Sequence, residues 1–118
     1  LLRLNQLRQN RRDVDAQLLD EANQAAERIG FSARALVFGE RRYRVSKAKL
    51  KIVEGDVESG VASEESVELA KSRVQDAEID LAARRADYLN AVSAFLTLVG
   101  ADEVAKDFSD DYSNPGPE

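Results

Sequence analysis

The stretch GDVESGVASEES, residues 55–66, holds two glycines and, together with Glu54 and Glu68 within two residues of its ends, six carboxylates. A glycine commonly ends a helix in a left-handed conformation, and a serine followed by glutamates is typical of a helix start. Gly60 can therefore end one helix, and Ser63 can cap the next. The stretch predicts a turn over residues 59–63 that joins two helices.

Apolar side chains recur at every seventh position on both sides of this turn. The rows of large residues are Ala22, Ile29, Leu36, Tyr43, Leu50 and Val57 before it, and Val67, Val74, Leu81, Tyr88 and Phe95 after it. Three residues later, rows of mostly small residues read Ala25, Ser32, Gly39, Ser46 and Val53, then Ala70, Ala77, Arg84, Ala91 and Leu98. A strict seven-residue repeat indicates helices that supercoil around each other. Arg84 is the exception in its row, and we expect it to extend into solvent or to pair with an acid of the first helix, such as Glu40.

The two large rows mirror each other about position 62, and only an antiparallel hairpin has that symmetry. The predicted fold class is all-α, a long antiparallel coiled-coil helical hairpin in residues 1–100, with helix one at about 13–58 and helix two at about 64–99. We expect Gly100 to end helix two as Gly60 ends helix one. Residues 101–118 are then expected to form a short extra helix in ADEVAKDF, residues 101–108, and an acidic disordered tail in SDDYSNPGPE, residues 109–118.

Composition excludes several classes of function. The chain of 118 residues is at most one domain, and it has no cysteine and no histidine. It therefore lacks the commonest general base and the commonest metal ligands, so we expect no enzyme, no cofactor and no metal site. Residues 1–51 are basic and the remainder is acidic, but the basic residues alternate with acids and no aromatic platform accompanies them. Nucleic acid is therefore not an expected partner.

Two observations indicate that the chain works with other helices. It begins without methionine or a signal-like segment, so we expect a processed or excised piece of a longer protein. Two helices alone also cannot bury all of the apolar side chains, because some of them lie off the seam. These residues are Phe31, Phe38, Leu89, Val92, Leu96 and Val99. Such surface usually packs against a further helix or chain, so we expect self-association or a larger parent protein.

The segment that starts at the turn resembles the last long helical pair of the TolC-like outer-membrane efflux proteins. In that family a turn of the form G-[V/T]-x-[S/T] precedes a helix with A-x(6)-A spacing, an aromatic-leucine pair and a final L-x-x-x-G. The residues that fall on this pattern are Gly60, Val61, Ser63, Ala70, Ala77, Leu81, Tyr88, Leu89, Leu96 and Gly100. The first helix has a compatible length and little signature of its own.

The resemblance implies a periplasmic helical duct of trimers, continuous with an outer-membrane β-barrel, that exports drugs, toxins or proteins. Its partners would be a periplasmic adaptor and an inner-membrane pump, and its location the periplasmic side of a bacterial outer membrane. This chain would supply one hairpin of that duct. The turn residues Gly60, Val61, Ala62 and Ser63 would contact the adaptor, with Ala62 exposed between its neighbours.

The carboxylates next to the turn are a second candidate site. Glu64, Glu65 and Glu68 would form an acidic gate if they faced the interior of a three-fold assembly. Family members carry an acidic ring just past this turn, but the aligned positions here are Ser66 and Leu69. The glutamates lie one residue earlier, which rotates them by about 100 degrees on the helix. A solvated acidic tip explains them equally well.

Two other readings of the chain remain open. A structural coiled-coil scaffold or oligomerisation segment, with no role in transport, would explain the repeats and the charge but not the turn motif. An adaptor of the same export machines also carries a helical hairpin, but its β-rich flanking halves have no counterpart in this sequence.

Overall fold

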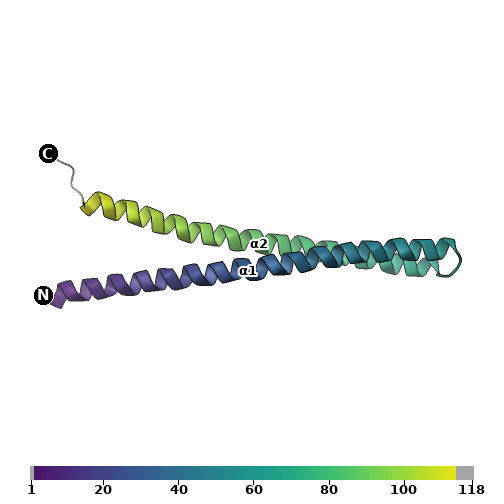
Figure 1. Cartoon of the computed structure of the whole chain (residues 1–118), viewed down its shortest axis with the longest axis horizontal. Coiled ribbons are helices and arrows are strands. Elements are labelled where there is room, and N and C mark those ends of the chain that lie inside the picture. The colour runs from purple at the N-terminus through teal and green to yellow at the C-terminus, as the bar shows by residue number, and fades with distance from the viewer. Residues whose placement is uncertain (1, 114–118) are drawn as a thin grey trace. The chain divides into compact units, whose positions relative to one another are not determined.

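The computed structural model describes the backbone of residues 2–113 and the side chains of residues 2–100. It contains two long helices, α1 (Leu2–Glu58) and α2 (Glu64–Ser113), which pack antiparallel and are joined by a short turn (Figure 1). The all-α hairpin predicted from the repeats is therefore confirmed. In the described part of the chain, neither helix has a stretch apolar enough to cross a lipid bilayer.

Contacts divide the chain into two compact units. The turn unit, Gly30–Leu89, contains the turn and the helical segments on either side of it. The terminal unit consists of Leu1–Ile29 and Asn90–Glu118. The candidate functional residues near the turn all belong to the turn unit.

Both helices are longer than the sequence suggested. Helix α1 already begins at Leu2 rather than near residue 13, because its first residues include neither glycine nor proline and none of them interrupts a helix. Helix α2 does not end at Gly100, which keeps a negative φ, and it continues to Ser113. A glycine inside a helix costs only about 1 kcal/mol, so it ends a helix only where the chain also turns.

The predicted short extra helix is therefore the continuation of α2, and the expected disorder of residues 109–113 was wrong. The first proline after Gly100 is Pro115, and a proline disfavours the helical conformation of the residue before it. The end of the helix at Ser113 agrees with that restriction. The rest of the predicted disordered tail, residues 114–118, lies outside the described residues.

The predicted seam is present in the turn unit. Each member of the four rows between Gly30 and Leu89 is buried or half-buried. The most buried positions are mainly small residues: Ser32, Gly39, Ala70, Ala77 and Leu81. Ala77, for example, is only 1% exposed. Because small side chains occupy the most buried positions of the seam, the two helices can approach closely there.

The same periodicity continues in the terminal unit. Its half-buried apolar side chains include Ala22, Ala25 and Ile29 of α1, and Phe95 and Leu98 of α2, while Ala91 is buried. These are the positions that the seven-residue repeat assigns to the seam. Leu7 and Val14, nearer the start of α1, are more than half exposed.

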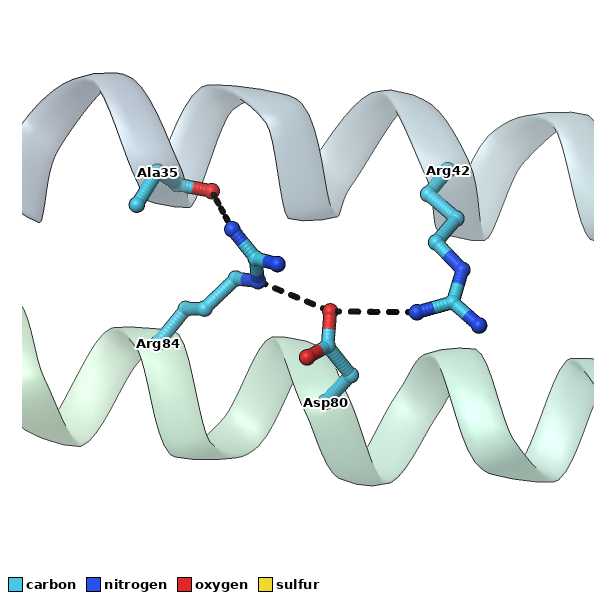
Figure 2. A network of polar contacts seen from close by, with 4 residues as sticks. All are labelled: Ala35, Arg42, Asp80 and Arg84. Carbon is cyan, nitrogen blue, oxygen red and sulfur yellow. Dashed lines mark hydrogen bonds and ion pairs between the residues drawn. The ribbon is translucent and has the colours of Figure 1, made fainter.

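A polar network at Arg84 joins the two helices within the turn unit (Figure 2). The Arg84 side chain donates one hydrogen bond to the carboxylate of Asp80 at 2.8 Å and another to the backbone carbonyl of Ala35 in α1 at 3.0 Å. Asp80 also lies 3.6 Å from the guanidinium of Arg42 in α1. The prediction that Arg84 pairs with an acid of the first helix such as Glu40 was wrong. Its partner is Asp80, which lies one helical turn before Arg84 on the same helix and orients it towards α1.

Gly39 provides the space that Arg84 occupies. A Cβ atom added at Gly39 would lie 2.7 Å from Arg84 Cδ and 3.6 Å from Leu81 Cδ1. The guanidinium of Arg84 then extends over the ring of Phe38, with 5.4 Å between its central carbon and the ring centroid. The missing side chain at position 39 and the long one at position 84 are therefore complementary across the seam.

Candidate functional site at the hairpin turn

The turn between α1 and α2 has the hydrogen-bond pattern of a Schellman motif. The amide of Gly60 donates to the carbonyl of Val57 at 3.1 Å, and the amide of Val61 donates to the carbonyl of Asp56 at 2.8 Å. Gly60 adopts a φ of 80°, as predicted for a left-handed residue after a helix. Its open surroundings, with nothing within 4 Å of an added Cβ, show that conformation rather than crowding requires the glycine.

The four predicted contact residues do not all face solvent. Gly60 and Ser63 are exposed, and the Val61 side chain is the most prominent, with 78% of its surface exposed. Ala62 is half-buried, so the expectation that it is exposed was wrong. Its amide donates to the carbonyl of Asp56 at 3.1 Å, which holds the residue against the end of α1. Val61, not Ala62, is therefore the apolar side chain that the turn presents.

Helix α2 begins as the sequence predicts, with a different role for the serine hydroxyl. Glu64 and Glu65 occupy the first turn, where the helix dipole favours carboxylates. The carbonyl of Ser63 accepts a hydrogen bond from the Ser66 amide at 3.1 Å, whereas the two hydroxyls lie 3.2 Å apart. The serine hydroxyl thus contacts a side chain instead of a backbone amide.

The three acidic gate candidates, Glu64, Glu65 and Glu68, are all exposed and lie outside the seam rows. Glu68 forms a surface ion pair with Lys71 at 3.7 Å. The arrangement places a group of carboxylates around the start of α2. Their role as a gate in an assembly stays a prediction.

The two positions that the resemblance to TolC-like proteins aligns with an acidic ring have a different environment from the glutamates. Ser66 and Leu69 line a groove of about 500 Å³ between the two helices, and we call it the basic groove. Its ten lining residues include the cations Arg42, Lys49 and Arg73, and none of the ten is acidic. Three of its apolar side chains, Val45, Ile52 and Leu69, are more than half exposed.

Sequence reasoning missed this groove because it noted Phe31 and Phe38 outside the seam but not the row to which they belong. A signal for it was nevertheless present. Phe31, Phe38, Val45 and Ile52 form a third row at seven-residue spacing in α1, and all four are exposed in the structure. A regular apolar row outside the seam indicates a second surface on which helices can pack.

The chain was compared with protein-family models, with curated proteins and with solved structures, and none of them matches.

A substitution at the turn tests its left-handed geometry. Replacing Gly60 with alanine should lower the free energy of unfolding by about 1 kcal/mol, because a Cβ atom disfavours a positive φ. Gly60→Asn should lose less, since asparagine tolerates this conformation better. Urea unfolding followed by circular dichroism measures both. Equal stability of all three proteins would mean that position 60 is not left-handed in solution.

Proposed function

We propose that this chain is a periplasmic helical hairpin of a TolC-like outer-membrane efflux or export duct, and that its turn docks a periplasmic adaptor. The observation that carries the proposal is the position of the motif Gly60-Val61-Ala62-Ser63. These residues form the connection between two antiparallel helices, and the Val61 side chain projects from it with 78% of its surface exposed.

The chemistry of the turn supports a role in contact with another chain. Val61 offers an apolar side chain, and such a residue contributes most to binding when a partner's pocket removes it from water. The amides of Ser63, Glu64 and Glu65 precede the first helical hydrogen bonds of α2, and the structure gives them no acceptor among the described residues. They could receive hydrogen bonds from a partner's oxygen atoms. Gly60 has no side chain that would hinder close approach.

The packing of the hairpin also supports this function. A duct built from helical hairpins requires the two helices of each hairpin to pack closely, and small buried residues such as Ala70 and Ala77 suit that requirement. In the duct, three copies of the parent protein would assemble, and an inner-membrane pump would complete the export machine. The exposed carboxylates near the turn would then lie at the periplasmic entrance.

Photo-crosslinking in the parent protein tests the proposal. A photoreactive amino acid at position 61, introduced into the full-length protein in its own cells, should crosslink to a periplasmic adaptor that mass spectrometry identifies. Position 79 is the matched control, because Ile79 is 70% exposed and lies in α2 away from the turn. We expect no adaptor crosslink there. Val61→Asp should weaken adaptor binding about tenfold, the equivalent of about 1.4 kcal/mol.

Cell fractionation separates the proposal from the scaffold alternative. A duct component should fractionate with the outer membrane. A parent protein found in the cytoplasm, with crosslinks from position 61 only to other cytoplasmic chains, would overturn the transport function and favour a coiled-coil scaffold.

A further inference from the structure

We propose that the basic groove binds an amphipathic α-helix of a partner protein, and that this helix carries carboxylates on its flanks. The groove is separate from the turn residues proposed to dock an adaptor. The inference concerns the charged and apolar side chains of the turn unit and does not depend on the proposed function.

The exposed apolar side chains of the groove have the seven-residue spacing on which another helix can pack. Val45 and Ile52 of α1 are seven residues apart and are 52% and 63% exposed, and Leu69 of α2, which lines the same groove, is 54% exposed. Side chains at this spacing accept the apolar stripe of a helix that lies alongside them. Two helices already form the walls, so an added helix would complete a three-helix arrangement.

The cations that line the groove favour a helix with carboxylates on its two flanks. The whole chain has a net charge of −5, yet this groove contains three cations and no acid among its lining residues. Arg42 shares the carboxylate of Asp80 at 3.6 Å, whereas the structure gives Lys49 and Arg73 no ion pair within the described residues. Lys49 comes from α1 and Arg73 from α2, so carboxylates on both flanks of a bound helix would find a cation. Complementary charge of this kind favours one partner over others.

Two designed peptides test the proposal directly. Both have three heptads with leucine at the apolar positions, and the flanking positions carry glutamate in one peptide and lysine in the other. Fluorescence anisotropy with the full chain should show that the glutamate peptide binds at least about tenfold more tightly at low salt. The difference should shrink at about 0.5 M salt, because exposed charges are then screened.

Matched variants identify the groove as the site. Lys49→Glu should weaken binding of the glutamate peptide about tenfold, whereas Lys51→Glu, the same change in charge at an exposed position outside the groove, should leave it unchanged. Leu69→Glu should abolish binding, and Ile79→Glu, on the same helix but outside the groove, should not. Circular dichroism verifies that each variant retains its helices.

Three results would overturn the inference. The first is equal binding of the two peptides, and the second is binding of neither. The third is self-association of the chain in analytical ultracentrifugation that Leu69→Glu abolishes, since a second copy of the chain would then cover the groove.

Discussion

Replacing Leu81 with alanine should lower the free energy of unfolding by about 3 kcal/mol. Leu81 is the largest side chain among the buried residues of the seam, with 4% of its surface exposed. The other buried residues of the turn unit are Ser32, Gly39, Ala70 and Ala77, whose short side chains cannot extend into the space that alanine leaves. The lost free energy then includes both the burial of the leucine side chain and the cost of the cavity that remains.

Ile79 provides the matched control for this prediction. It lies two residues away on the same helix, and 70% of its surface is exposed. Ile79→Ala should change the free energy of unfolding by no more than about 0.5 kcal/mol. Urea unfolding of both variants, followed by circular dichroism, measures the difference. Similar losses at the two positions would contradict the assignment of the seam.

The second large effect is expected at Gly39, where a side chain would enter occupied space. Gly39→Leu should lower the free energy of unfolding by about 2 kcal/mol, because its Cβ would lie 2.7 Å from Arg84 Cδ and the rest of the leucine would reach Leu81. The same substitution at Gly55, where nothing lies within 4 Å of an added Cβ, should instead raise stability by about 0.8 kcal/mol through helix propensity.

Removing Arg84 should reverse the sign of a smaller change at Gly39. In the native chain, Gly39→Ala displaces Arg84 and disturbs its hydrogen bond to the Ala35 carbonyl, so a net loss of about 1 kcal/mol is expected. In an Arg84→Ala background, the same alanine should stabilise by about 1 kcal/mol through helix propensity. A double-mutant cycle with urea unfolding measures this coupling. Additive effects would show that the two residues are not in contact.

The course of the hairpin could be predicted because two independent sequence signals agree. The seven-residue rows define which side chains form the seam, and their mirror symmetry about position 62 agrees with the turn at Gly60. Both signals depend on local spacing, which a sequence displays directly. The start of α1 and the end of α2 were harder to predict, because Gly100 has no turn around it and a lone glycine does not stop a helix.

The candidate site could be predicted only in part for a similar reason. Residues at the turn follow from a single motif, whereas the exposure of Val61 and the partial burial of Ala62 depend on which amides bond to the carbonyl of Asp56. The partner of Arg84 could not be predicted, because acids on both helices, Glu40 and Asp80, lie near it in the spacing of the sequence. Side chains of both helices line the basic groove. The groove can therefore be recognised only once it is known which residues of the two helices lie side by side.

The contact between Gly39 and Arg84 has a consequence for how the hairpin withstands force along its axis. A repeat of seven residues is nearly the same after a shift of seven, so the repeat by itself does not distinguish one alignment of the two helices from the next. Here that displacement would move Ser32 or Ser46 opposite Arg84, and each carries a side chain where the arginine needs an empty position. The unequal pair therefore distinguishes one axial alignment from the next, and it would hold the two helices of the turn unit in a single register while a partner pulls on the turn.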